Sequence, residues 1–266
     1  MKRIIILLLA MMAAPLTANA MTQDDILRAE ILPGWRAADG RHMAALSLTL
    51  APGWKTYWRS PGEAGIPPIF DWSGSTNLRG VQMHWPSPVV FHTNGMQTIG
   101  YHDRLVLPFE VRLDDPGAPA AIALRVDLGV CRDICLPAMV DLSAVLAVTS
   151  TQDPAITDAL AEAPVSGRRA GVSGITCTVD PISDGLRLTA SIDLPAQGGR
   201  ETVVFEPADP SVWVAESVST RKAGRLVAQT DLVPPSGKPF ALDRSAITVT
   251  VISDRGSVEI VGCPAP

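Results

Sequence analysis

Two cysteines lie close together between two apolar, strand-like runs, in the segment Gly129-Val130-Cys131-Arg132-Asp133-Ile134-Cys135-Leu136-Pro137. The Cα atoms of a disulfide lie roughly 4.4 to 6.8 Å apart, whereas four steps of extended chain span about 13 Å. The two sulfurs can therefore pair only if the chain turns back between them. The spacing thus predicts a turn between the two runs, closed by a disulfide.

The chain holds two further cysteines, Cys177 and Cys263. On the chain-entropy model, a bond between Cys131 and Cys135 restrains the unfolded chain by about 2 kcal/mol, against about 4.6 kcal/mol for a bond between Cys177 and Cys263. The long loop suits a stabilising cross-link. The short loop favours a bond that opens and closes, and hence a redox role for Cys131 and Cys135.

Residues 1–20 have the pattern of a secretory signal peptide. Lys2 and Arg3 form the basic end, residues 4–14 the apolar core, and Ala18-Asn19-Ala20 the cleavage site. The apolar run is too short to span a bilayer, and no later segment has the roughly 18 apolar residues of a membrane helix. We therefore expect export to the periplasm, an oxidising compartment that permits disulfides. An uncut signal anchor is the alternative.

Composition argues against nucleic acid as a partner. Without the signal peptide, 20 basic residues stand against 27 acidic ones, and such a surface repels phosphate groups. Proline (23 residues) and glycine (21 residues) are plentiful, and helical periodicity is scarce. The sequence therefore predicts an all-β protein of short strands separated by turns.

Apolar or alternating runs place the expected strands. In the first half they are 42–50, 81–85, 104–113, 121–128 and 139–148; in the second half they are 174–179, 185–194, 202–205, 212–218, 226–232, 246–252 and 257–261. Two long connections, 52–62 and 91–97, interrupt the first series, and connections of that length in a compact domain are commonly functional. Strands at this spacing indicate antiparallel sandwiches.

The pattern divides the mature chain into two domains, 21–150 and 170–266, each large enough for its own core. Between them, residues 151–169 are expected to form a linker with one short helix. Asp153 is the predicted N-cap of that helix, and Pro154 its first residue.

Chemistry alone leaves three interpretations of Cys131 and Cys135 open. The first is an inert structural disulfide, the second is an exchanging redox pair, and the third is a metal site that would need further soft ligands. The candidate ligands considered in this half are His84, His92, Met96 and His102. Exchange needs an accessible thiolate. Arg132 would stabilise the thiolate and Asp133 would destabilise it, so these residues do not fix the direction in which the pKa of the thiol shifts.

A resemblance carries the interpretation further. It rests on Gly53-Trp54-Lys55-Thr56-Tyr57-Trp58-Arg59, on Gly100-Tyr101-His102-Asp103-Arg104-Leu105-Val106-Leu107-Pro108, and on Cys131-x3-Cys135-Leu136-Pro137. These motifs, in this order, resemble the periplasmic amino-terminal domain of the thiol:disulfide interchange protein DsbD, in the branch of the suppressor-of-copper-sensitivity protein ScsB. The resemblance covers residues 30–150 well. The second half is more loosely similar, through Val204-Phe205-Glu206-Pro207.

The resemblance implies a fold and a set of roles. The fold is two immunoglobulin-like antiparallel β-sandwich domains joined by a short helical linker. Cys135 would form the mixed disulfide with partners, Cys131 would resolve it, and Tyr57 and Tyr101 would be neighbours of the active site. A cap loop would cover the sulfurs, and by position it consists of Phe91, His92, Thr93, Asn94, Gly95 and Met96. DsbD spaces its cysteines more widely and has an acidic and aromatic cap.

The resemblance also implies partners. Electrons would come from a separate membrane-embedded thiol reductase of the DsbD, ScsB or CcdA type, and would pass to periplasmic thioredoxin-fold disulfide proteins. The function expected is that of a thiol:disulfide oxidoreductase without metal or organic cofactor, acting in copper tolerance, cytochrome maturation or disulfide repair. Cys177 and Cys263 are expected to form a structural disulfide. The contrasting hypothesis is an exported, non-catalytic module that binds a protein or a copper ion.

Overall fold

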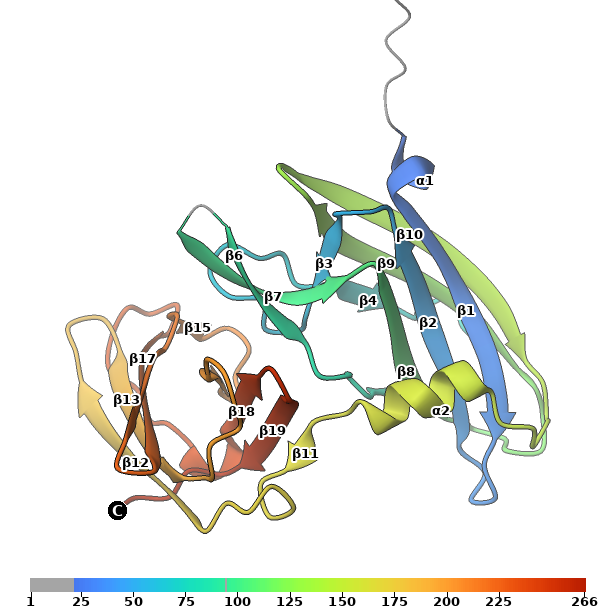
Figure 1. The fold of residues 1–266 in the computed structure, drawn as a ribbon. Coiled ribbons are helices and arrows are strands. Elements are labelled where there is room, and N and C mark those ends of the chain that lie inside the picture. The colour runs from blue at the N-terminus through green and yellow to red at the C-terminus, as the bar shows by residue number, and fades with distance from the viewer. Residues whose placement is uncertain (1–21, 94) are drawn as a thin grey trace, which may run out of the picture.

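The structure is a computed structural model that describes residues 22–93 and 95–266 (Figure 1). The predicted signal peptide, residues 1–20, lies outside the described residues. Over the described part the chain is mostly β, as predicted, and its strands form four sheets with almost entirely antiparallel neighbours. No helix in that part is both long and apolar enough to cross a membrane.

The first sheet pair contains the strands β1 to β10. One of its sheets has the order β1 (Leu27–Arg36), β2 (His42–Leu50), β8 (Arg104–Arg112) and β5 (Gly80–Met83). The other has the order β10 (Cys135–Leu146), β9 (Ala120–Cys131), β3 (Lys55–Tyr57), β7 (Met96–His102) and β6 (Val89–Thr93), with β4 (Ile69–Asp71) paired to β9. A one-turn helix, α1 (Gln23–Ile26), precedes β1.

One hydrophobic core lies between these two sheets. Alternate side chains of each strand point into it, as the period of two requires. Leu46 on β2 and Phe109 on β8 meet Leu124 and Val126 on β9, and all four are buried. Because the core takes the face of β9 that carries Leu124 and Val126, Cys131 at the end of that strand lies on the other face.

The second sheet pair contains β11 to β19. One sheet has the order β11 (Val165–Ser166), β19 (Gly256–Val261), β18 (Thr248–Ser253) and β14 (Thr202–Glu206). The other has the order β12 (Gly174–Pro181), β13 (Leu186–Asp193), β17 (Arg225–Val233) and β15 (Trp213–Val214), with β16 (Val218–Lys222) also paired to β17. The 3-10 helix η1 (Arg244–Ala246) precedes β18. A separate core fills this pair.

The helix α2 (Pro154–Ala161) lies between the two sheet pairs in sequence and packs against β8 (Figure 1). Its predicted start is confirmed, since the Asp153 carboxylate accepts a hydrogen bond from the Ala155 amide at 2.8 Å. Ile156 is fully buried against Trp35 and Ala45 on the outer side of the first sheet. The short helix is therefore anchored by its own apolar face.

Most predicted strands are confirmed within a few residues, and β2 matches its predicted range. Residues 212–218 were expected to form one strand, but they contain β15 and the start of β16, which both pair with β17. The strand β1 was not predicted, because Pro33 and Gly34 interrupt its pattern. They are tolerated since β1 is an edge strand with a bulge between Leu32 and Trp35.

Both connections predicted to be long loops contain strands. Within 52–62, the residues Lys55–Tyr57 form β3, which pairs with β7 and β9. The prediction of a loop over 91–97 is wrong, because β6 and β7 run through it as a hairpin. Asn94, at the turn, lies outside the described residues, and Gly95 has a positive φ of 80°. An Asn-Gly pair between two β runs is a strong hairpin signal, which explains the difference.

Candidate active site

The hairpin of β9 and β10 brings Cys131 and Cys135 together. The two strands pair over twelve residues each, and their register ends with Cys135 directly opposite Cys131. The structure joins them by a disulfide with Cα atoms 4.1 Å apart. The Arg132 amide donates to the Ile134 carbonyl at 3.1 Å, which closes the turn. The predicted turn is thus confirmed, and it is the tip of a long hairpin.

The two sulfur-bearing residues differ sharply in exposure. Cys131 is 1% exposed, whereas Cys135 is an exposed residue. Arg132, Asp133 and Ile134 in the turn are exposed as well. A thiolate of another protein, or a disulfide that approaches from solvent, therefore meets Cys135 first.

Tyr57 is the residue that contacts both sulfurs. Its hydroxyl lies 2.9 Å from the Cys131 Sγ and 3.3 Å from the Cys135 Sγ. The strand β3 places it there, because Lys55 pairs with Cys131 and Thr56 pairs with Val130. A disulfide sulfur has no hydrogen to donate, so the hydroxyl is the donor in both contacts.

Gly129 provides the space that the Tyr57 ring occupies. A Cβ atom at position 129 would lie 3.0 Å from the Tyr57 Cε2 atom and 2.9 Å from the Ile66 Cβ atom. The contact with Ile66 is closer than real Cβ atoms allow, and the contact with Tyr57 could form only if the ring shifted. The absence of a side chain at Gly129 therefore lets Tyr57 and Ile66 lie side by side over β9, next to the disulfide.

Burial sets the protonation of the polar groups around the site. It raises the pKa of the Tyr57 phenol, which keeps the hydroxyl protonated and able to donate at neutral pH. Burial also lowers the pKa of Lys55, whose ammonium donates to the Thr98 hydroxyl at 2.8 Å. In the exposed turn, Arg132 forms an ion pair with Asp133 at 3.2 Å.

The residues of the predicted cap lie on the β6–β7 hairpin at the other edge of the same sheet. The Lys55 ammonium lies 4.7 Å from the centre of the Phe91 ring and 6.0 Å from that of Tyr57. His92 contacts Arg200 of the second sheet pair at 3.1 Å, and Met96 is exposed. Phe91 is thus connected to the site through Lys55, while His92 faces elsewhere.

The structure does not bring Tyr101 to the sulfurs. Tyr101 pairs with Thr56 whereas Cys131 pairs with Lys55, so their side chains lie on opposite faces of the sheet. The Tyr101 hydroxyl donates to the Pro86 carbonyl at 2.8 Å, inside the core. The presence of Tyr101 in the resembling motif is explained by its packing in the core.

No pattern in the sequence assigns a role in the site to Gly129 or Ile66. The only sequence signal for Gly129 is a glycine within a strand, which often marks a close approach of another group. Trp54 and Trp58 are buried in the first core.

Cys177 and Cys263 form the second disulfide, with Cα atoms 5.4 Å apart. The pairing predicted for them is confirmed. Both residues are fully buried, and the bond ties β12 of one sheet to the segment after β19 of the other. Elsewhere in the described residues, no group of three or more His, Cys, Asp or Glu side chains is placed to hold a metal ion.

Comparison with known proteins shows what the part of the chain that carries this site is similar to. A family model described as the N-terminal part of the thiol:disulfide interchange protein DsbD matches residues 28–147. A crystal structure of the N-terminal periplasmic domain of ScsB from Proteus mirabilis has the same fold, with a TM-score of 0.69. The two chains are 24% identical, and the match covers 92% of this chain and 96% of that one. No curated protein matches the sequence.

The matched range contains β3 with Tyr57 and the complete β9–β10 hairpin with both of its cysteines. The resemblance on which the sequence analysis relied is thereby confirmed. Residues 28–147 of this chain are thus similar to the N-terminal domain of the thiol:disulfide interchange protein DsbD.

Proposed function

We propose that this chain is a periplasmic thiol:disulfide interchange protein that relays electrons through a reversible bond between Cys131 and Cys135. One observation carries the proposal: within a single disulfide, Cys135 is exposed and Cys131 is buried, and the Tyr57 hydroxyl contacts both sulfurs. Such asymmetry suits exchange, because the rate depends on access and a partner can reach only one of the two sulfurs.

The exchange follows from this geometry in two steps. In the reduced protein, the Cys135 thiolate attacks one sulfur of the partner's disulfide; a mixed disulfide forms, and the partner's other sulfur leaves as a thiolate. The Cys131 thiolate then attacks the Cys135 Sγ and releases the partner's remaining thiolate. The partner gains two electrons, and the Cys131–Cys135 bond forms. A membrane-embedded dithiol reductase returns two electrons by the reverse sequence.

Tyr57 supports both steps as a hydrogen-bond donor. Because its pKa is raised by burial, the phenol stays neutral and can donate to whichever sulfur carries negative charge. It contacts the sulfurs of Cys131 and Cys135 from one side, which leaves the exposed side of Cys135 open. The hydroxyl can therefore stabilise the attacking thiolate in the first step and the resolving thiolate in the second.

The surface around Cys135 is apolar enough to receive a partner. Ile134 is 66% exposed beside the exposed sulfur-bearing residue, and Met139 is 53% exposed on the same strand. Cys135, Pro137 and Met139 alternate along β10 and share one face. Exposed apolar side chains next to a reactive group are typical of a protein docking surface.

The finer features of the fold and the pathway belong to the same proposal. Each sheet pair would be an immunoglobulin-like sandwich domain, with boundaries at 21–150 and 170–266 and the linker 151–169 between them. The donor would be a membrane-embedded thiol reductase of the DsbD, ScsB or CcdA type, and the acceptors periplasmic thioredoxin-fold disulfide proteins. Export through a cleaved signal peptide would deliver the protein to them.

The test is a redox titration of the whole mature protein in glutathione buffers, followed by alkylation and mass counting of free thiols. We expect two thiols, those of Cys131 and Cys135, to appear at potentials above about −300 mV, the range of exchanging disulfides. The buried bond between Cys177 and Cys263 should stay intact. If all four cysteines resist reduction in this range, the exchange function is refuted and the binding-module hypothesis is favoured.

A further inference from the structure

The loop that follows β3 leaves the disulfide and returns to it. Its first residue after Tyr57, Trp58, donates its amide to the Ile99 carbonyl at 3.0 Å, and the Ile99 amide donates back to Pro61 at 2.9 Å. A few residues later, Ile66 lies over Gly129 beside the Tyr57 ring. The conformation of this loop thus bears on both side chains that lie over β9 at the sulfurs.

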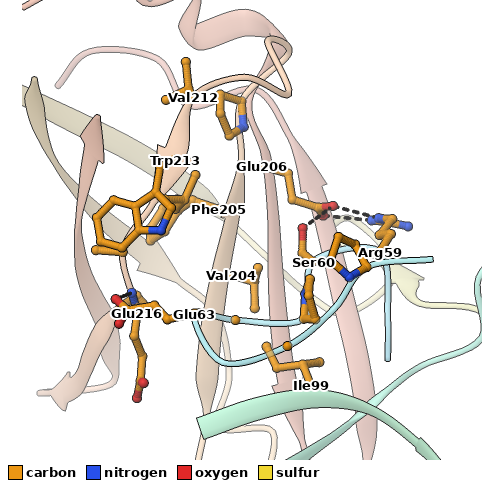
Figure 2. Close-up of a pocket in the computed structure, with 18 of the residues that line it drawn as sticks. Arg59, Ser60, Glu63, Ile99, Val204, Phe205, Glu206, Val212, Trp213 and Glu216 are labelled. Atoms are coloured by element: carbon orange, nitrogen blue, oxygen red, sulfur yellow. Dashed lines mark hydrogen bonds and ion pairs between the residues drawn. The ribbon is translucent and has the colours of Figure 1, made fainter. Parts of the chain in front are cut away.

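The same loop is held by the second sheet pair at two places. Arg59 donates to both carboxylate oxygens of Glu206 at 2.8 and 2.9 Å, and to Glu259 at 2.8 Å. Further along, the Glu63 carboxylate accepts from the Glu216 amide at 3.1 Å. Figure 2 shows these two attachments at opposite sides of a cleft between the loop and the second sheet pair. The cleft has a volume of about 570 Å³.

Arg59 is the centre of this interface. Its side chain is only 28% exposed and lies over the Trp58 ring, 4.6 Å from the ring centre. Burial by itself lowers the pKa of Arg59, but the hydrogen bonds and charges of Glu206 and Glu259 outweigh it and raise the pKa above its ordinary value. Both carboxylates contact the same nitrogen, Nη2. Without Arg59 they would repel each other.

We propose that Arg59, held by Glu206 and Glu259, is a positioning residue through which the second sheet pair keeps Tyr57 in contact with the Cys131–Cys135 sulfurs. The inference rests on the proposed exchange function. It gives the second sheet pair, whose own cysteines are locked in a buried bond, a part in the reaction. Its effect passes along two residues of backbone, from Arg59 to Tyr57, and through Ile66 at the end of the loop.

The direction of the effect follows from the chemistry of the hydroxyl. A Tyr57 hydroxyl held near the sulfurs stabilises a thiolate more than it stabilises the neutral disulfide. Release of the loop weakens this contact. The pKa of the reactive thiol then rises, and the equilibrium with glutathione moves toward the disulfide.

The experiment compares Arg59→Met with the matched control Arg187→Met. Arg187 makes the same two-bond contact, at 2.8 and 2.9 Å, with Asp231 on an exposed face of the second sheet pair. In Arg59→Met we expect the glutathione equilibrium constant to move about fivefold toward the disulfide, the factor for one lost hydrogen bond. The pH at which alkylation of the reduced protein is half-maximal should rise. Arg187→Met should match the wild type in the equilibrium constant and in the pH of half-maximal alkylation.

Two further variants keep the test decisive. Glu206→Gln preserves side-chain volume and leaves Arg59 paired with Glu259, so it serves if Arg59→Met does not fold, and it should shift both readouts in the same direction. In a Tyr57→Phe protein, Arg59→Met should add nothing, because the hydroxyl through which it acts is gone.

The outcomes separate the two proposals. If the wild type does not exchange with glutathione, the exchange function and the positioning role are both refuted. If the wild type exchanges while Arg59→Met and Glu206→Gln are folded and unchanged, only the positioning role is refuted. Full additivity of Arg59→Met and Tyr57→Phe also overturns it, because the effect would then bypass Tyr57.

Discussion

Cys131 and Cys135 share one bond, yet only Cys135 can be reached from solvent. Cys131→Ser should therefore leave an attacking thiol that cannot be resolved, and mixed disulfides with periplasmic proteins should accumulate. The measurement is non-reducing electrophoresis of the tagged protein after acid quenching. Cys135→Ser is the matched control and should trap little, because its remaining thiol is buried. Equal trapping by the two variants would contradict the assignment of Cys135 as the attacking residue.

His42 makes a second prediction at the scale of a single residue. It is fully buried; its Nδ1 accepts from the Arg36 side chain at 3.2 Å, and its Nε2 donates to the Pro33 carbonyl at 2.6 Å. Burial is the largest cause that lowers its pKa below 6.5, and the Arg36 charge acts in the same direction. Protonation would place a hydrogen on the nitrogen that accepts from Arg36.

The pH dependence of stability follows from this shift. Below pH 6.5, the ordinary value, the unfolded chain binds a proton at His42 before the folded chain does. The free energy of unfolding should therefore fall as the pH is lowered, by up to about 1.4 kcal/mol per pH unit for this group. Urea titrations followed by tryptophan fluorescence at several pH values measure the slope. His42→Gln should flatten it, and an unchanged slope in that variant would contradict the assignment.

The cysteines and Tyr57 could be read from the sequence because the chemistry and the resembling motif both point to them. The role of Ile66 could not be predicted, because the conformation of the loop after β3, and not a strand pattern, brings it to Tyr57. Tyr101 belongs to another of the three resembling motifs, but strand alternation turns it into the core. A motif therefore identifies which residues matter, while the face of the sheet decides which of them contact the sulfurs.

Among the elements, the β9–β10 hairpin depends on one glycine for its chemistry. Gly129→Ala would introduce a Cβ atom 3.0 Å from the Tyr57 ring, so the ring has to move away. We expect a loss of about 1 to 3 kcal/mol in the free energy of unfolding, as for other overpacked sites, together with slower exchange with glutathione. Gly117→Ala is the control, because only the end of the Asp115 side chain lies within 4 Å of that position. Unchanged exchange in a folded Gly129→Ala protein would show that the ring position is not needed.

The β6–β7 hairpin stands where a cap was predicted, and its cap role stays a prediction. Phe91 packs on Lys55 near Tyr57, and Met96 is exposed close to the turn. Replacing both by Ala should raise the rate at which a small reagent alkylates reduced Cys135, if the hairpin shields that thiol. Stopped-flow alkylation at matched pH measures the rate. Equal rates in the two folded proteins would exclude shielding by this hairpin.

At this scale the sequence predicted strands best where apolar alternation is uninterrupted, as in β2 and β9. It failed where a strand contains Pro-Gly, as in β1, or where a hairpin was interpreted as a long loop, as in β6 and β7. The strand β3 has only three residues, too few for a periodic signal. Its position is determined by partners on both sides, β7 and β9, which a local pattern does not reveal.

For the whole molecule, the two disulfides should differ in their effect on stability. Replacing Cys177 and Cys263 by Ala should lower the free energy of unfolding of the second sheet pair by about 2 to 5 kcal/mol, because this bond closes a long loop and joins two sheets. Replacing Cys131 and Cys135 should cost less. Thermal unfolding of the two double variants measures the ranking. A larger loss from the short-loop pair would contradict a stabilising role confined to the long one.

Composition and strand spacing predict two domains, and their boundaries stay a prediction. The interface between the sheet pairs could not be predicted. Its ion pairs join residues 147 and 200 positions apart, from Arg59 to Glu206 and to Glu259. Nothing in the local sequence of an arginine after a tryptophan indicates which distant carboxylate it will meet.

Cys177 and Cys263 are completely buried, and this has a consequence for disulfide exchange within the protein. A protein that contains both a free thiolate and a disulfide can undergo internal thiol–disulfide exchange, which pairs its cysteines wrongly. Here the attacking sulfur would have to pass through a closed core to reach the second bond. The two cysteine pairs are thus kinetically insulated from each other, so repeated turnover should leave the pairing of the second sheet pair unchanged.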